Sequence, residues 1–234
     1  GAKLYFKDSL LKQAGINLLG GRAKIIPFSP FVYPEYEQAE IPLLKVLQWG
    51  TLPYVILSDD PKSEIIDYID VYLREEVKAE ALVRSIAQFS KFLELAATTV
   101  SEQIVYDSLC SDVGVTAPTI KEYFQILEDT LVGTRLYPYS KTIRRKAMAS
   151  AKFYFFDVGL SNALLKRFSL HEKTSEFGIA CEQYIFQEIS AFVNQRKPTV
   201  SLFYWRSYDK SEVDFVIELD NRHVILIEAK SANK

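Results

Sequence analysis

Residues 212–230, EVDFVIELDNRHVILIEAK, decide the fold of the C-terminal part of the chain. Two runs rich in Val, Ile, Leu and Phe flank a short polar break at Asn221. The pattern predicts a β-hairpin, because Asn tolerates the left-handed backbone that a tight loop needs. A hairpin centred on Asn221 makes Asp214 and Glu228 cross-strand partners, with Cβ atoms about 5 Å apart. Lys230 follows Glu228 by two residues and therefore points to the same face.

The two facing carboxylates indicate a cation site. Like charges that face each other destabilise a sheet, and a divalent cation between them would remove the repulsion. Ligation by oxygen atoms alone favours Mg²⁺ or Mn²⁺. Lys230 could then orient and polarise an attacking water, which is the outline of a hydrolytic site. The simpler alternative is a solvated acidic face. The opposite face is expected to be buried, and its residues are Val213, Phe215, Ile217, Ile225 and Ile227.

The order Asp214, then Glu228-x-Lys230 on the next strand, resembles the signature of the PD-(D/E)XK nucleases. In that family an upstream helix contributes another carboxylate. Glu182 lies in the apolar stripe of a predicted helix, where an acid needs a partner because burying it alone is costly. The resemblance therefore implies Asp214, Glu228 and Glu182 as metal ligands, with Lys230 completing the catalytic set. The predicted order also matches the family's core: a helix over 178–193, then strands over 202–206, 212–219 and 223–230.

Three motifs nearer the start of the chain resemble a group of bacterial and archaeal AAA-type ATPases. They are NLLGGRA at 17–23, GTLP at 50–53 and YLREEV at 72–77. After the ATPase module, those proteins carry a C-terminal region of unassigned function that is related to the PD-(D/E)XK nucleases. The phosphate loop GxxxxGK[ST] is absent here, so no ATPase activity is expected from this chain alone, and ATP belongs only to the full-length family context. Arg22 is a candidate phosphate contact, and a structural arginine is the alternative.

Residues 84–130 predict a helix-turn-helix. Two helical segments, 84–97 and 103–113, precede Gly114, which permits the tight turn. Thr116 is expected to cap the next helix, and Pro118 fits its first turn. Strands over 131–136 and 153–156 would complete a winged helix, and Asp157 would cap a short helix after it.

These patterns divide the chain into three parts. Residues 1–80 are the expected trailing part and lid of an AAA-type ATPase module, and 81–157 a winged-helix-like domain. Residues 158–234 are the expected nuclease-like domain, and the helix and strand that the family normally adds after Glu-x-Lys are expected to be missing or supplied otherwise. The fold class is therefore α+β, with a mostly helical N-terminal half and then an α/β nuclease-like domain.

A basic stretch between the predicted wing strands indicates a nucleic-acid contact. Residues 133–156 include six Lys and Arg side chains and no carboxylate, with Tyr137 and Tyr139 interleaved. Such clustering is typical of a wing that touches phosphates. The alternative is a solvated loop, or one docked on the acidic segment 59–80. The expected contacts with DNA are Lys121 in the second helix and Lys141, Arg144, Arg145 and Lys146 in the stretch.

Composition limits the remaining classes. Hydrophobic residues make up 48% of the chain and charged residues 25%, which is typical of a folded protein rather than a disordered one. The sequence contains no run of about 18 apolar residues, so it predicts no membrane span. The start of the chain lacks the apolar core of a signal peptide. Cys110 and Cys181 are expected to be small buried side chains in a reducing cytosol, so the predicted location is cytoplasmic.

Two functions remain open at this point. The first is an Mg²⁺- or Mn²⁺-dependent nuclease coupled to an ATPase motor in the full protein. The second is a non-catalytic module that binds nucleic acid or protein, in which the nuclease-like sheet is an inactive scaffold. DNA is the expected partner, through the winged helix and the basic stretch, and a homo-oligomer or an ATPase partner domain fits the same resemblance.

Overall fold

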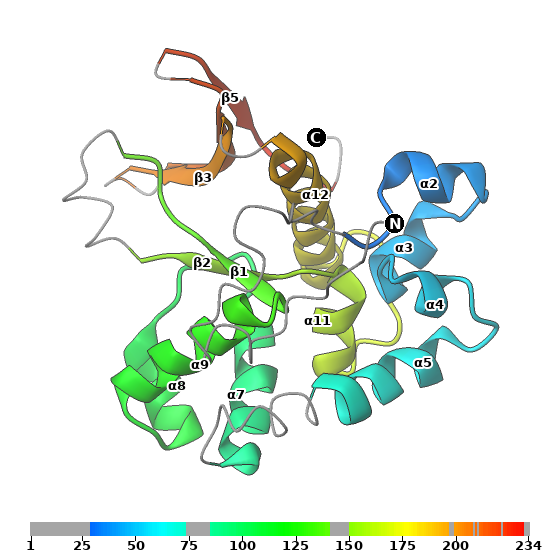
Figure 1. Ribbon diagram of the computed structural model, residues 1–234, viewed down its shortest axis with the longest axis horizontal. Coiled ribbons are helices and arrows are strands. Elements are labelled where there is room, and N and C mark those ends of the chain that lie inside the picture. Colours follow the sequence, from blue (N-terminus) through cyan, green and yellow to red (C-terminus); the bar gives the residue numbers. More distant parts are fainter. Residues whose placement is uncertain are drawn as a thin grey trace, which may run out of the picture.

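The computed structural model describes residues 29–73, 85–140, 150–196, 199–207, 209, 211–220 and 222–231. The fold is mixed α+β, with helices around two small antiparallel sheets (Figure 1). Short helices at the N-terminal side flank the long helix α12, and a second helical group lies at its other side. The helices are α2 (Tyr33–Gln38), α3 (Leu43–Trp49), α4 (Pro53–Ile56), α5 (Pro61–Asp67), η1 (Tyr68–Leu73), α7 (Ile86–Thr98), α8 (Tyr106–Val113), α9 (Ala117–Asp129), α11 (Val158–Leu164) and α12 (Ser175–Arg196). The strands are β1 (Gly133–Leu136), β2 (Lys152–Phe155), β3 (Ser201–Arg206), β4 (Glu212–Glu218) and β5 (Val224–Ile227).

The turn between α8 and α9 has the predicted form. Gly114 takes the left-handed conformation with φ +80°, and its N–H donates to the Cys110 carbonyl at 2.9 Å. Helix α9 then begins at Ala117, with Pro118 in its first turn. The prediction that the Thr116 side chain caps this helix is wrong: Thr116 is the N-cap residue, but its hydroxyl lies 3.1 Å from the Thr119 hydroxyl and makes no cap hydrogen bond.

Replacing Gly114 by valine is expected to damage folding. No atom lies within 4 Å of a Cβ placed there, so the cost comes from the backbone alone: about 1–2 kcal/mol for a side chain forced into the left-handed region. Gly114→Asn is the matched control, since Asn tolerates that region. Thermal melting tests this, and equal melting temperatures for Gly114→Val and the parent would refute it.

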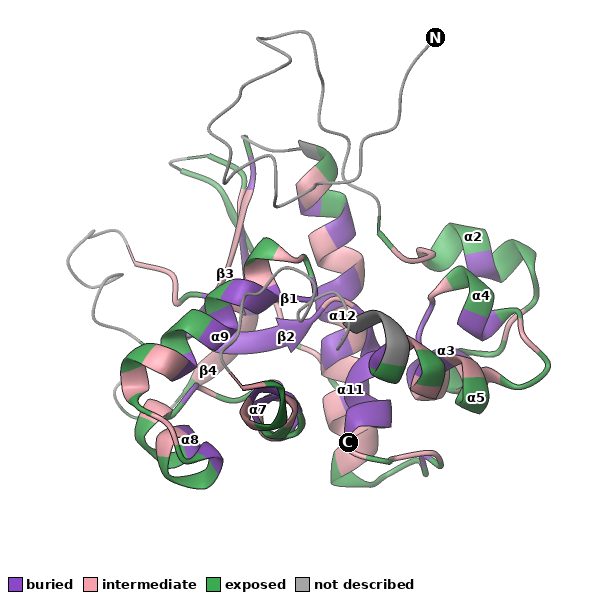
Figure 2. Ribbon diagram, turned by 60° about the horizontal axis from the view of Figure 1, so that its bottom comes forward, coloured by how far each residue is buried: buried purple, intermediate pink, exposed green. Residues whose placement is uncertain are grey.

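The two-stranded sheet brings β2 into the centre of the molecule. Strand β1 pairs with β2 in antiparallel register, Gly133 with Phe155, and all four residues of β2 are buried (Figure 2). A single cluster of buried side chains extends from Val55 in α4 to Phe215 in β4. The same core therefore packs against the helix-turn-helix, α11, α12 and the second sheet. Cys110 and Cys181 are free thiols that pack against the core but are only partly buried, so the expectation of buried cysteines holds in part.

The three-stranded sheet has the order β3-β4-β5, and its hairpin has the predicted register. Phe215 pairs with Ile227 and Ile217 with Ile225, as a hairpin centred on Asn221 predicts. The expected strand over 223–230 is shorter, because β5 ends at Ile227.

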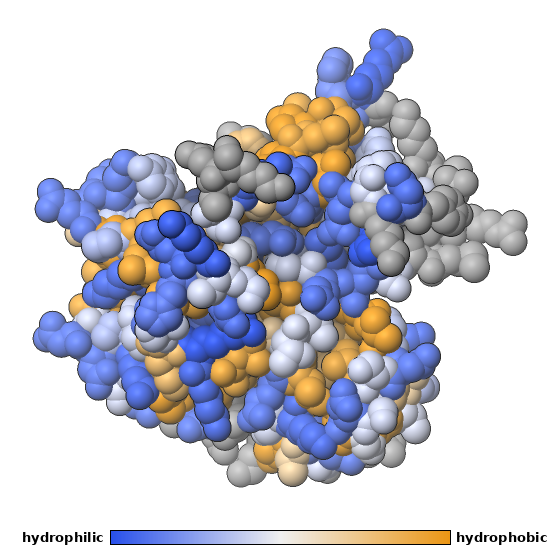
Figure 3. Space-filling model, turned by 180° about the vertical axis from the view of Figure 1, so that it is seen from behind, coloured by the Kyte–Doolittle hydropathy of each residue, from blue (hydrophilic) through white to orange (hydrophobic). Residues whose placement is uncertain are grey.

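The expected burial of one hairpin face holds in part. Phe215 and Ile217 are buried, Val213 and Ile227 are partly buried, and Ile225 on β5 is 45% exposed. Among the described strands, β5 lies at the edge of this sheet and pairs with β4 alone. Its apolar side chains form a patch below the hydrophilic tip of the hairpin (Figure 3).

A buried carboxylate joins the N-terminal helices to α11. The side chain of Asp157 caps α11 as predicted, accepting from the N–H groups of Gly159 at 2.8 Å and Leu160 at 3.3 Å. The Asp157 side chain also accepts a hydrogen bond at 2.7 Å from the N–H of Thr51, a residue just after α3. Gly50 has φ +77°, and a Cβ there would lie 1.9 Å from Asp157 Oδ1. The glycine of GTLP is therefore required by this close approach.

Within the described ranges, no helix combines the length and apolar character needed to cross a membrane.

Candidate carboxylate site between β2, α12 and β4

The site starts from alternate residues of β2. Lys152 and Tyr154 are two residues apart on a strand and so share a face. The Tyr154 hydroxyl donates to Glu182 Oε1 on α12 at 2.6 Å. The Lys152 ammonium lies 3.4 Å from the same oxygen. Glu182, predicted from its place in an apolar helical stripe to need a partner, therefore has two.

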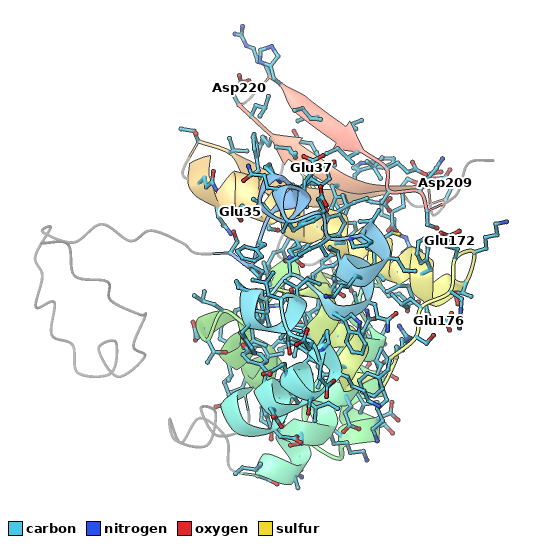
Figure 4. All side chains as sticks on the ribbon, turned by 90° about the vertical axis from the view of Figure 1, so that its right-hand side faces the viewer. Glu35, Glu37, Glu172, Glu176, Asp209 and Asp220 are labelled. Atoms are coloured by element: carbon cyan, nitrogen blue, oxygen red, sulfur yellow. The ribbon has the colours of Figure 1, made fainter. Side chains whose placement is uncertain are left out.

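Strand β4 contributes two more carboxylates, again from alternate positions. Glu212 forms an ion pair with Lys152 through Oε1, and its Oε2 lies 3.1 Å from Arg206 Nη1. Asp214 Oδ2 accepts a hydrogen bond from the Ala229 N–H at 2.8 Å, which ties the segment after β5 to β4. Asp220 at the hairpin tip and Asp209 in the β3–β4 loop mark the two ends of this sheet (Figure 4). Glu172 and Glu176, near the start of α12, appear on the same side of this view as Asp209. The start of β4 lies near the first half of α12, because Glu212 and Glu182 both pair with Lys152.

The electrostatics of the site follow from burial and from these neighbours. The pKa of Glu182 is raised, chiefly by burial. The Lys152 ammonium and the Tyr154 hydroxyl act to lower this pKa, and the Asp214 carboxylate acts to raise it. Burial lowers the pKa of Lys152, but Glu182, Glu212 and Asp214 outweigh burial, so the pKa is raised and the ammonium stays charged. Burial, followed by Glu182, raises the pKa of Tyr154 well above its usual value, which keeps the phenol as a donor. Asp214 thus acts on all three groups.

Glu228 and Lys230 lie apart from this buried group. Lys230 Nζ is 3.4 Å from Glu228 Oε1, and the two side chains are 70% and 55% exposed. Among the residues that the structure describes, no group of three or more His, Cys, Asp or Glu side chains is placed to hold a metal ion. The structure therefore brings together Glu182 and Asp214 of the predicted set, and it places Glu228 and Lys230 as a pair at the surface of the same hairpin.

The carboxylates still offer oxygen atoms to a ligand. The hydrogen bonds and ion pairs of the described residues end on Oε1 of Glu182 and on Oδ2 of Asp214. Among the described residues, these contacts do not use Oε2 of Glu182 or Oδ1 of Asp214. Hard oxygen donors of this kind fit Mg²⁺ or Mn²⁺, so the residues are compatible with such an ion.

Most of the predicted DNA contacts lie outside the described residues. These are Lys141, Arg144, Arg145 and Lys146, and the same holds for Arg22. Lys121 is exposed on α9, with its ammonium 5.4 Å from the centre of the Tyr106 ring.

Two further cations of the basic stretch have internal partners. Arg135 pairs with Glu128 at 2.5 Å and donates to Gln125 at 2.6 Å. Lys152 is buried at the carboxylate site, so neither side chain is available to a phosphate backbone.

Sequence reasoning missed Lys152, Tyr154 and Glu212 as members of the site. A signal was present, because Lys152 is the first residue of KFYFF and the four residues that follow it are all aromatic. A lysine at the start of a strand that is buried on both faces needs an acidic partner. Glu212 stands two residues before Asp214 and so shares its face.

Comparison with known proteins gives two family matches. Residues 42–171 match a domain of unknown function (DUF8612), and residues 177–234 match a second domain of unknown function (DUF4143). DUF4143 is commonly found in the C-terminal regions of AAA-type ATPases. Uncharacterized proteins of Mycobacterium bovis and Mycobacterium tuberculosis are each 29% identical over 117 residues, which is 49% of this chain. The match spans 25% of each of those relatives. No solved structure matches.

Proposed function

The chain belongs to the DUF8612 family, whose function is unknown, and we propose from its own residues that it is the C-terminal part of an AAA-type ATPase. In this proposal, the C-terminal part binds DNA and hydrolyses phosphodiesters with Mg²⁺. Membership of DUF8612 says nothing about chemistry. The match of residues 177–234 to DUF4143, a domain common at the end of AAA-type ATPases, supports the ATPase context.

The DNA-binding part of the proposal rests on the unit formed by α7, α8, α9, β1 and β2. Three helices with a left-handed glycine turn, followed by an antiparallel pair of strands, are the arrangement expected of a winged helix. The exposed Lys121 lies on the second helix of the turn, which is the usual recognition helix. The segment 141–149 links the two strands and supplies four further cations.

The nuclease part rests on the unit formed by α12, β3, β4 and β5. The single observation that carries it is the approach of Glu182 on α12 to Asp214 on β4, where each carboxylate has one oxygen fixed by an internal hydrogen bond. Fixed carboxylates are preorganised ligands. Glu182 and Asp214, the two members of the predicted set that meet, would hold the ion, which when bound would polarise a phosphate oxygen and lower the pKa of a water. Tyr154 and the Ala229 N–H orient these two ligands.

Incubation with supercoiled plasmid tests the activity directly. The parent protein in millimolar Mg²⁺ should nick or linearise the plasmid, and a chelator should prevent it. Glu182→Gln removes one proposed ligand, whereas Glu172→Gln neutralises an exposed carboxylate outside the site and is the matched control. Cleavage that survives both Glu182→Gln and the chelator would exclude this site as its source.

A second function is favoured by one specific observation. Lys152 already forms ion pairs with Glu182 and Glu212, so part of the negative charge of the site is offset without a metal. In that case the chain would bind DNA or a protein partner and leave it uncut. Binding to labelled duplex with no cleavage in Mg²⁺ or Mn²⁺ would favour this alternative.

Replacing Arg144, Arg145 and Lys146 together by alanine is expected to weaken DNA binding and flatten its salt dependence. Each phosphate contact that is lost should reduce the log–log salt slope by about 0.9 on duplex DNA. Anisotropy titrations at several salt concentrations measure this slope. The control replaces three lysines elsewhere, Lys62, Lys91 and Lys173, and an unchanged slope in the first variant would exclude the basic stretch as the DNA contact.

A further inference from the structure

Lys152 is a buried lysine with an unusual set of neighbours. It is 2% exposed, and its ammonium lies between Glu182 on α12 and Glu212 on β4, 5.5 Å from the centre of the Tyr204 ring. A buried ammonium is tolerated only where charges or hydrogen bonds replace its water. The position is therefore a built cation site, and the cation in it is a side chain of the protein.

The lysine and its partners come from different parts of the fold. Lys152 belongs to β2, which pairs with β1 after the helix-turn-helix, whereas both of its carboxylates belong to α12 and the second sheet. Contacts on either side of it fix the same junction. Pro138 bridges to Tyr204 on β3, and the Tyr204 hydroxyl donates to the Ser150 carbonyl at 2.5 Å. These two contacts join the segments after β1 and before β2 to β3, next to the lysine.

We propose that Lys152 is the resident counter-ion of the carboxylate site, so that a divalent cation at Glu182 and Asp214 has to compete with an ammonium supplied by strand β2. The proposal rests on the proposed function for the identity of the competing ion. It makes Lys152 a positioning residue that sets how strongly the site attracts a metal, and it connects the helix-turn-helix unit to that site.

Charge counting gives the expected direction. Glu182, Glu212 and Asp214 carry three negative charges, and Lys152 and Arg206 carry two positive charges, which leaves a net charge of −1. Without Lys152 the same groups carry −2. An entering divalent cation meets one opposing charge fewer, at the short distance and low dielectric where such a charge matters most. A lysine that acted only as a structural strut would predict the opposite, because its loss would disorder the ligands.

The test measures binding of Mn²⁺ alone by calorimetry or by electron paramagnetic resonance. Lys152→Met keeps the length of the side chain and removes the charge, and Lys91→Met, at an exposed lysine of α7, is the matched control. We expect Lys152→Met to bind Mn²⁺ at least about tenfold more tightly than the parent. Adding Asp214→Asn to Lys152→Met should remove that gain, whereas Lys91→Met should bind as the parent does.

A companion pair guards against misfolding. If Lys152→Met alone does not fold, Lys152→Met with Glu212→Gln removes one carboxylate together with the ammonium, and it should bind Mn²⁺ more tightly than Glu212→Gln alone. The proposal is overturned if Lys152→Met binds Mn²⁺ no more tightly than the parent and the double variant binds it no more tightly than Glu212→Gln. This result would leave metal binding by the parent intact. If Lys152→Met binds Mn²⁺ and the parent does not, the proposal is supported and metal-dependent cleavage by the parent is excluded. No Mn²⁺ binding by any variant overturns both.

Discussion

Asp157→Ala is expected to lower the free energy of unfolding by about 3 kcal/mol or more. The carboxylate is fully buried and accepts hydrogen bonds from the N–H groups of Thr51, Gly159 and Leu160. Alanine would leave these donors buried without partners, and each unpaired donor costs about 1–3 kcal/mol. Urea denaturation followed by circular dichroism measures the loss. Asp59→Ala, at an exposed aspartate before α5, is the control and should change little.

The same carboxylate predicts a pH dependence with a definite sign. Burial raises the pKa of Asp157 to about 6, and the hydrogen bonds from Thr51, Leu160 and Gly159 oppose this rise. Because the folded pKa lies above the unfolded value of 3.8, the stability linked to this proton is fully present below about pH 3.8 and is lost as pH rises through about 6. Asp157→Asn cannot titrate and should lack this decline. An identical pH profile for Asp157→Asn and the parent would contradict the assignment.

Asp214→Asn is expected to abolish metal-dependent cleavage of DNA by the parent protein, with a loss of about a hundredfold or more. The substitution removes the charge of one ligand and leaves its shape. Asparagine retains a carbonyl oxygen that can accept the hydrogen bond from the Ala229 N–H, so the hairpin should keep its geometry. Plasmid cleavage over time measures the effect, with Asp59→Asn as the matched control. Cleavage by Asp214→Asn at the parent's rate would remove Asp214 from the site.

The hairpin was predictable because its information is local. A period of two, one polar break and one Asn define both strands and their register, and the pairs from Phe215–Ile227 to Ile217–Ile225 confirm it. The glycine turn at Gly114 was predictable for the same reason. The exposure of Ile225 was not, since it depends on what covers β5, and an alternating pattern carries no information about that.

The site was only partly predictable, because burial changes the role of charged residues. Lys152 counted as one more cation in a basic stretch, yet β2 runs through the core and its lysine pairs with Glu182 and Glu212. Arg135 was assigned to the same stretch and is held by Glu128. Conversely, Glu228 and Lys230 share the expected strand face but pair with each other at the surface. Register fixes which residues oppose one another, and packing decides which of them meet.

Thermal melting of the parent and of Asp214→Asn, each in millimolar Mg²⁺ and in chelator, tests the central claim that Asp214 belongs to a divalent-cation site. An ion that binds only the folded protein raises its melting temperature by mass action. The parent should therefore melt higher in Mg²⁺ than in chelator. Asp214→Asn should melt at the same temperature in both, and in chelator no lower than the parent, because one of several neighbouring negative charges is gone. No response to Mg²⁺ in either protein, together with a destabilised Asp214→Asn, would contradict the claim and make Asp214 a structural residue.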